Sequence, residues 1–202
     1  IKALGVLRIG GGHRGEITVQ DHLLGNTEHV LHAQAPQGLG DEFVTGAVEG
    51  LVSDVVILDH HLGAETLPAA LAVVNPNRLD ESGDLGFLCA ASVVFLMLVE
   101  VNRQMRAEGA QGPDLMGLLD LVALATVADV APLVGVNRAL VRQGLKIMAR
   151  RERPGLVALS DVARLDQAPS AYHLGFVLGP RVNAGGRIGA ADLGARLLST
   201  DD

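Results

Sequence analysis

The sequence predicts an α/β fold with a parallel sheet core and a helix-rich C-terminal half. Residues 55–58 are Val, Val, Ile and Leu, a short run rich in β-branched residues that is typical of a strand buried on both faces. Residues 70–74 form a second short apolar run, which we also expect to be a buried strand. From residue 87 onward the apolar segments are longer, which is typical of helices.

Each predicted element follows from this pattern. We expect helices at residues 87–106, 114–127, 137–151, 156–162 and 190–198, and a short strand at residues 1–9. The two apolar runs lie so close in sequence that their strands must be neighbours or one must form a sheet edge. Residues 10–15 and 179–189 are rich in glycine and are expected to be flexible loops. We assign residues 54–202 to one core and leave residues 1–53 as an unassigned N-terminal segment.

Composition restricts the class of protein. The 202 residues are 49% hydrophobic with a mean hydropathy of +0.32, as expected for a globular protein. No apolar run is long enough to span a bilayer and the N-terminus does not resemble a signal peptide, so we expect a soluble cytoplasmic protein without a membrane partner. The single cysteine, Cys89, excludes a disulfide framework, and its apolar neighbours favour a thiol in the core.

The net charge of −7 argues against a surface that is basic all over and binds nucleic acid by charge alone. A local basic groove remains compatible with it. The chain has no Trp, one Tyr and four Phe, few rings for stacking unpaired bases.

Asp59, His60 and His61 directly follow the first predicted strand, where open α/β sheets place their chemistry. Neutral imidazoles and a carboxylate are good ligands for a divalent transition metal, which can activate water. The alternative is that one His stabilises a loop and Asp59 caps a following helix.

Two acids interrupt the apolar helix predicted at residues 114–127. Asp120 lies within it and Asp129 at its end. A carboxylate in such surroundings is costly unless it is paired, hydrogen-bonded or bound to metal. Asp129 is therefore a second candidate ligand.

Polar side chains elsewhere suggest contacts with phosphate. Arg138, Arg142 and Lys146 recur every four residues and form a basic stripe, which can hold a phosphate backbone, although a solvated helix face is the commoner meaning. Arg181 and Arg187 suit fork-like contacts with phosphate oxygens. Asn75 and Arg78 either face the same sheet edge as Asp59 or, as we favour, merely close a turn.

Several motifs follow one another along the chain: Asp59-His60-His61, Asn75-Pro76, the stretch 119–133 with Thr126-Val127-Ala128-Asp129, Asn137-Arg138, and Pro180-Arg181-Val182-Asn183-Ala184-Gly185-Gly186-Arg187. Together and in this order they resemble the DHH phosphoesterases, and among them the RecJ-type exonucleases specific for single-stranded DNA. The resemblance covers about residues 54–202.

The resemblance implies a function in DNA repair and recombination. Members of this family bind two divalent ions, Mn²⁺ or Mg²⁺, and hydrolyse phosphodiesters from the 5′ end of single-stranded DNA. A single-strand-binding protein or a helicase is the expected protein partner. By resemblance His60, His61 and Asp129 are metal ligands, and Asp59 supports or shares their coordination. Arg181, Asn183 and Arg187 match the family's last core motif and are expected to contact substrate, with a junction to a further domain as the alternative. Arg138 and Arg142 of the basic stripe are also expected to contact substrate.

The resemblance fails in residues 1–53. The family's Asp-Tyr-Asp-x-Asp-Gly and Val-Asp-Cys-Gly motifs, which supply further ligands, do not occur there, and the family continues beyond the point where this core ends. Two metals without these carboxylates would be under-coordinated, so we expect weak metal binding and little turnover from this chain alone. The alternatives are a non-catalytic module that binds DNA or a replication partner, and a phosphoesterase acting on short oligonucleotides or cyclic dinucleotides.

Overall fold

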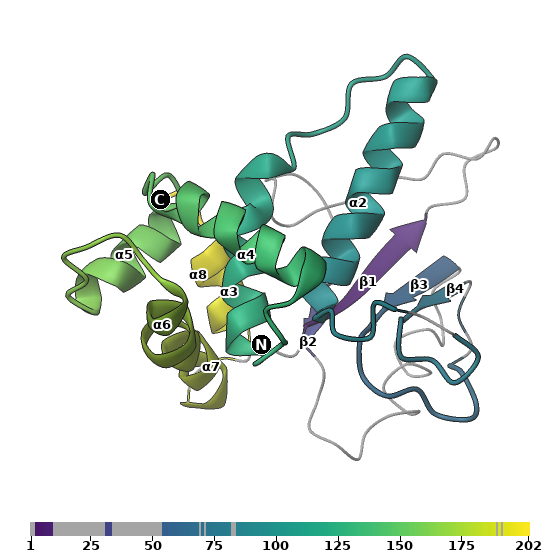
Figure 1. Cartoon of the computed structure of the whole chain (residues 1–202), viewed down its shortest axis with the longest axis horizontal. Helices are drawn as coiled ribbons and strands as arrows, with labels where there is room; N and C mark the ends of the chain where they lie inside the picture. The colour runs from purple at the N-terminus through teal and green to yellow at the C-terminus, as the bar shows by residue number, and fades with distance from the viewer. Residues whose placement is uncertain are drawn as a thin grey trace. The chain divides into compact units, whose positions relative to one another are not determined.

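A computed structural model describes residues 3–9, 31–33, 54–68, 70, 72–81, 84–188, 190 and 192–202 (Figure 1). The chain divides into two compact units, a sheet unit of residues 2–86 and a helical unit of residues 87–202. The predicted domain boundary at residue 54 stays a prediction. The glycine-rich loop at residues 10–15 lies outside the described residues.

The sheet unit contains a mixed four-stranded sheet in the order β2-β1-β3-β4. Its strands are β1 (Ala3–Ile9), β2 (Leu31–Ala33), β3 (Asp54–Leu58) and β4 (Ala72–Val74). β3 and β4 pair in parallel, with Leu58 opposite Val74, which confirms that the two apolar runs are neighbouring parallel strands. The short N-terminal strand is also confirmed, but β1 runs antiparallel to both β2 and β3, so the sheet is not parallel throughout.

The two central apolar runs differ in burial. Val56, Ile57 and Leu58 of β3 are buried, as their sequence predicts. β4 is an edge strand with Ala72 and Val74 exposed, so the prediction that it is buried was wrong. A strand at the edge has a partner on one side only, and its apolar residues therefore remain accessible to water.

The helical unit contains most of the remaining elements. They are α2 (Ala90–Ala107), the 3₁₀ turn η2 (Met116–Leu118), α3 (Leu119–Ala128), α4 (Gly135–Met148), α5 (Pro154–Val162), α6 (Ala171–His173), the π-helix η3 (Leu174–Leu178), α7 (Gly179–Ile188) and α8 (Leu193–Ser199). The predicted helices over residues 87–162 and 190–198 therefore form within a few residues of their expected bounds. No helix in the described part of the chain is long and apolar enough to cross a membrane.

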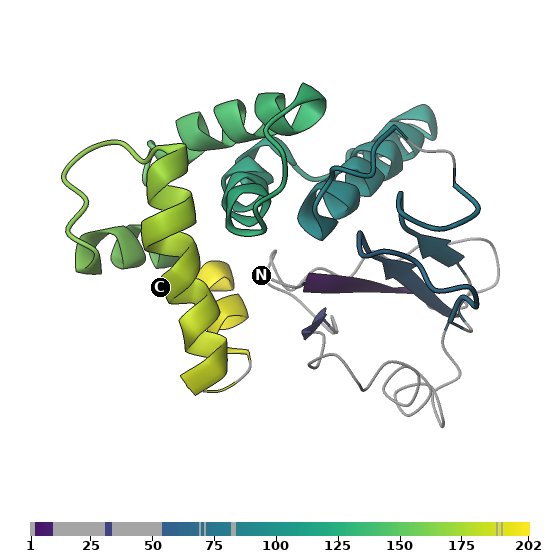
Figure 2. The same ribbon diagram turned by 60° about the horizontal axis from the view of Figure 1, so that its bottom comes forward.

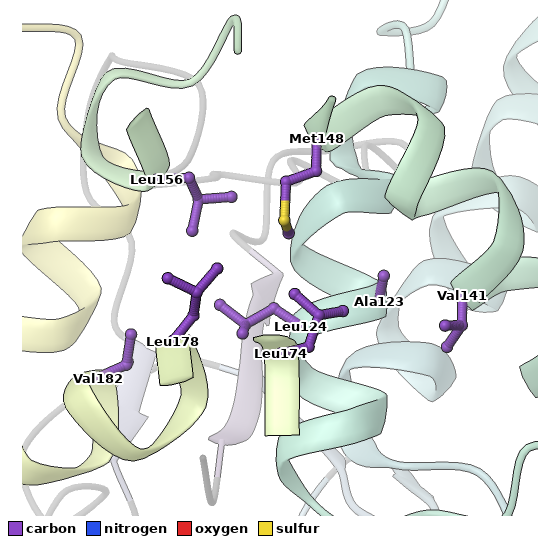
Figure 3. Packing of buried hydrophobic residues seen from close by; sticks show 8 residues of the cluster. All are labelled: Ala123, Leu124, Val141, Met148, Leu156, Leu174, Leu178 and Val182. Atoms are coloured by element: carbon purple, nitrogen blue, oxygen red, sulfur yellow. The ribbon is translucent and has the colours of Figure 1, made fainter. Parts of the chain in front are cut away.

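α3 is buried because helices pack on several of its sides. It contacts α2, α4, η3 and α7. Leu124 of α3 lies among Leu174, Leu178 and Met148 in one hydrophobic core (Figure 3). Cys89, which precedes α2, is buried against Ser92 and Thr126, so the prediction of a thiol in the core is confirmed.

The flexible loop predicted at residues 179–189 was wrong, because α7 covers residues 179–188. In Figure 2, α6, η3 and α7 form one continuous helical rod beside α8. Pro180 lacks an amide hydrogen, and the wider π turns of η3 directly before it accommodate the missing bond. Leu178 and Val182 are buried in the core, so packing overrides the poor helix propensity of the glycines.

Candidate metal centre

The Asp-His-His triplet lies at the carboxyl end of two parallel strands. β3 ends at Leu58, and the backbone N–H of Asp59 still donates to the carbonyl of Val74 at 3.0 Å, so both strands end at one sheet edge. The residues that follow β3 and β4 therefore meet there, which is the less favoured of the two alternatives that the sequence left open.

Asp59, His60 and His61 bring their ligand atoms together. One ligand atom from each side chain lies within 4.8 Å of the others, and all three residues are half-buried. The two imidazole rings have centroids 4.4 Å apart and are tilted by 52°. Two imidazole nitrogens and a carboxylate oxygen form a donor set that fits Mn²⁺ or a similar divalent cation. The residues therefore fit the metal that the sequence predicts at this edge.

Asp59 orients His61. Its Oδ1 atom accepts hydrogen bonds from the backbone amides of His60 (2.7 Å) and His61 (3.3 Å) and lies 2.7 Å from Nδ1 of His61. An ionised carboxylate can only accept, so Nδ1 is assigned the proton and Nε2 keeps the lone pair that a metal needs. Residues 59–68 contain no helix, so the alternative in which Asp59 caps a following helix does not apply.

Asn75 and Asn77 hold the histidine backbone in place. Buried Asn75 donates from Nδ2 to the carbonyl of His61 at 2.8 Å, and Asn77 donates to the carbonyl of His60 at 2.7 Å and to that of Gly86 at 2.9 Å. The side chain of Asn75 accepts the backbone N–H of Asn77 at 2.8 Å. This turn therefore fixes the carbonyls of both candidate ligands, a role that the sequence left open for Asn75 and did not suggest for Asn77.

Two glycines leave room for this turn. A Cβ atom on Gly63 would lie 3.0 Å from Cα of Arg78, and one on Gly86 would lie 2.5 Å from Oδ1 of Asn77. Arg78 itself closes the turn, donating to the carbonyl of Val73 at 2.7 Å and pairing with Asp80. The guanidinium hydrogen bond keeps the pKa of the Asp80 carboxyl below its usual range.

Asp129 belongs to the helical unit, where it is the half-buried C-cap residue of α3. The next residue, Val130, adopts a left-handed backbone with φ 58°, which is strained for a β-branched side chain. Fully buried Asn137 bridges the loop that follows, donating to the carbonyls of Pro132 (3.0 Å) and Phe87 (2.8 Å). Whether Asp129 shares an ion with His60 and His61 stays a prediction.

Asp120, the other acid in the apolar helix, has a structural partner. Its carboxylate accepts from Nε of Arg153 at 2.7 Å and from Nη2 at 3.0 Å, and both side chains are largely buried. Arg153 also donates to the carbonyl of Gly117. The sequence predicts that a carboxylate in this apolar helix is paired, hydrogen-bonded or bound to metal. Asp120 is paired, with Arg153.

The predicted substrate-contact residues lie on two helices. Arg138, Arg142 and Lys146 are exposed on α4, as predicted for a stripe. Arg181, Asn183 and Arg187 lie on α7, where a spacing of four places the last two on one helix face and Arg181 on another. Their contact with substrate stays a prediction.

The chain is similar to known proteins over most of its length. Residues 42–126 match the DHH family, N-terminal domain. The single-stranded-DNA-specific exonuclease RecJ of Dickeya dadantii is 45% identical over 156 residues, which cover 73% of this chain and 27% of that protein. RecJ of Escherichia coli is 44% identical with the same coverage, and RecJ of Thermus thermophilus is 35% identical over 74% of this chain and 21% of its own length.

Crystal structures of RecJ exonucleases share the fold of this chain. A crystal structure of exonuclease RecJ bound to manganese has a TM-score of 0.65 and 33% identity, covering 82% of this chain and 40% of that one. A crystal structure of RecJ from Thermus thermophilus in complex with Mn²⁺ has a TM-score of 0.63 and 34% identity, covering 81% and 24%. The predicted α/β fold of the DHH type is confirmed. The chain spans about a quarter of the length of the curated relatives it matches.

Proposed function

Because this chain contains a DHH family N-terminal domain and is homologous to RecJ exonucleases, we propose that it is the core of a metal-dependent 5′-to-3′ exonuclease. It hydrolyses phosphodiesters of single-stranded DNA in repair and recombination. The observation that supports this most directly is the cluster of Asp59, His60 and His61, whose ligand atoms converge at the end of β3.

His60 and His61 hold a Mn²⁺ or Mg²⁺ ion through imidazole nitrogens in this proposal. Asp59 keeps His61 in the tautomer that offers Nε2, and Asn75 and Asn77 fix the two histidine carbonyls. A bound divalent ion lowers the pKa of water and stabilises negative charge on phosphorus oxygens. We propose Asp129 as a further ligand, since a carboxylate that ends an apolar helix suits this role.

Substrate contacts come from the helical unit. We propose that Arg181, Asn183 and Arg187 of α7 and the exposed stripe on α4 bind the phosphate backbone. A single-strand-binding protein or a helicase is the protein partner we propose for the full assembly, in line with a role in repair.

The experiment measures release of nucleotides from 5′-phosphorylated single-stranded DNA in Mn²⁺ by the chain and by His61→Ala. A matched control is Leu62→Ala, since Leu62 is the next residue and its side chain is 89% exposed. Because the family's further carboxylate ligands do not occur in residues 1–53, the proposal expects slow release by the wild-type chain and by Leu62→Ala, and none by His61→Ala. Release that persists in His61→Ala would contradict it.

A second candidate is a non-catalytic DNA-binding module. The sequence favours it at one point, because residues 1–53 contain neither of the family's Asp-rich motifs. This candidate predicts that wild-type and His61→Ala chains bind single-stranded DNA equally and that neither releases nucleotides in any divalent metal.

A further inference from the structure

Two aromatic side chains are exposed together on the helical rod of α6, η3 and α7. The rings of Tyr172 and Phe176 stack with centroids 5.1 Å apart and an interplanar angle of 29°. Tyr172 is 63% exposed and Phe176 72% exposed. Phe95, by contrast, is buried in the core. In a chain with one Tyr and four Phe, the pair leaves a large fraction of the aromatic surface in water.

The opposite side of the same rod explains why the rings point outward. Leu174 and Leu178 are fully buried and point into the core (Figure 3). Gly175 and Gly179 lie against the end of α3, since a Cβ on Gly179 would lie 2.9 Å from Cβ of Ala128. The rod is therefore anchored by Leu and Gly, and the rings lie on a face that packing does not use.

This anchoring attaches the rod that carries the rings to the end of α3, the helix that also carries a candidate ligand. Ala128 is the last residue of α3 and directly precedes Asp129. A Cβ on Gly175 would lie 3.3 Å from Cγ1 of Val127, so η3 contacts the same helix end. The aromatic pair and Asp129 consequently belong to one packed assembly within the helical unit.

The charge of the rod suits a phosphate chain. No acidic residue occurs between Asp166 and Asp192, although the whole chain has a net charge of −7. Exposed Arg181 donates from Nη1 to the carbonyl of Val177 at 2.8 Å, which places a guanidinium beside the residue that follows Phe176. His173 also contacts Tyr172, with ring centroids 5.7 Å apart.

We propose that Tyr172 and Phe176 form a base-stacking platform for single-stranded nucleic acid, with Arg181 contacting the adjoining phosphate. Aromatic faces stack on any base, and a cation beside them holds the backbone, the usual combination for sequence-independent binding of single strands. The low aromatic content argues against a long stacking surface, but a pair of rings suffices for one or two bases. This platform rests on the proposed function and gives the position at which the proposed nuclease binds its single-stranded substrate.

The chain provides its own probe for this platform. Tyr172 is the only Tyr and Trp is absent, so intrinsic tyrosine fluorescence reports on this site alone. Titration with oligo(dT), with metal chelated to prevent cleavage, should quench the fluorescence to saturation. An abasic strand of the same length should bind more weakly and should not quench, because it presents the phosphates without the bases.

Variants of the platform separate stacking from charge. By anisotropy of a labelled oligo(dT), the double variant Tyr172→Leu, Phe176→Leu should bind about 5-fold to 150-fold more weakly with an unchanged salt slope. Its affinity for the abasic strand should equal that of the wild type. The single variant Tyr172→Phe keeps two aromatic rings and should bind as tightly as the wild type. Val162→Ala, at another exposed apolar residue, should have no effect on binding.

Several results would overturn the platform. These are unchanged affinity for oligo(dT) in the double variant, saturation without quenching, or no binding of oligo(dT) by the wild-type chain. A double variant that binds DNA normally but changes oligomeric state would assign the rings to a protein contact instead. Because metal is chelated, these results are independent of nucleotide release, so the platform and the proposed nuclease can fail separately.

Discussion

A single carboxylate oxygen organises the candidate metal centre. Oδ1 of Asp59 receives two backbone amides and Nδ1 of His61, so one atom sets both the loop conformation and the histidine tautomer. The family resemblance implies that Asp59 lies beside the proposed metal, and whether it binds the ion or orients a ligand depends on backbone geometry. The structure favours the orienting role.

Asn77→Ala should weaken binding of Mn²⁺ by about 10-fold or more, because the change frees the backbone carbonyls of His60 and Gly86. Calorimetric titration of Mn²⁺ measures the effect. The matched control is Asn102→Ala, which removes a similar bond from Nδ2 to the carbonyl of Pro113 in the helical unit. Equal losses of Mn²⁺ affinity in both variants would show that Asn77 has no specific role.

Asn137→Ala should lower the free energy of unfolding by about 1–3 kcal/mol, because the carbonyls of Phe87 and Pro132 lose the buried donor that bridges them. Denaturant unfolding of the variant measures the change. Arg138→Ala, at the next and exposed position, should change stability by less than about 0.5 kcal/mol. A stability loss in Asn137→Ala no larger than in this control would contradict the account of the loop after Asp129.

At the scale of elements, close packing of α3 and α4 supports the helix that ends in Asp129. A Cβ on Gly144 of α4 would lie 2.0 Å from the carbonyl oxygen of Leu119 and 2.5 Å from Cβ of Ala123. Glycine is therefore required by the close approach of the two helices, not by a turn.

Gly144→Ala should destabilise the protein by about 1–3 kcal/mol through overpacking. The control is Gly117→Ala, since a Cβ on Gly117 would meet nothing within 4 Å. Thermal unfolding of the two variants is the measurement. A melting temperature of Gly144→Ala that matches that of Gly117→Ala would show that the helices can separate at no cost.

The elements were predictable to different degrees. Apolar runs identify β3 and the helices of residues 87–162 because burial imposes their periodicity. The helix α7 was missed because three glycines and Pro180 oppose it locally, and packing against α8 and the core stabilises it. The exposure of β4 was missed although an edge strand was one expected arrangement, because the apolar runs alone do not show which strand lies at the edge.

At the scale of the whole molecule, the proposed function requires an acidic chain to bind an acidic polymer. The net charge is −7, so any attraction to phosphate must come from local surfaces such as the exposed cations on α4. Metal binding also reduces the local negative charge at the carboxylates. Asp120 pairs with Arg153, which lies 33 residues further along the chain. The role of a charged residue therefore depends on a partner that the local sequence does not show.

The double variant Arg142→Ala, Lys146→Ala should reduce the slope of log affinity for single-stranded DNA against log salt by about 1.4, at about 0.7 for each phosphate contact. Binding titrations at several salt concentrations measure the slope. Arg103→Ala with Arg106→Ala on α2 makes the same change in net charge and should leave the slope unaltered. An equal change of the salt slope in both double variants would show that the stripe on α4 is a solvated helix face and does not contact phosphate.

The most direct test of the central claim is a titration of the purified chain with Mn²⁺, followed by the electron paramagnetic resonance of free Mn²⁺. If the Asp-His-His cluster is a metal site, the wild-type chain and Leu62→Ala bind the ion with the same affinity. His60→Ala and His61→Ala then lose most of that affinity while their unfolding temperatures stay close to that of the wild type. Equal Mn²⁺ binding by the wild type and both histidine variants would contradict the assignment of this sheet edge as the metal centre.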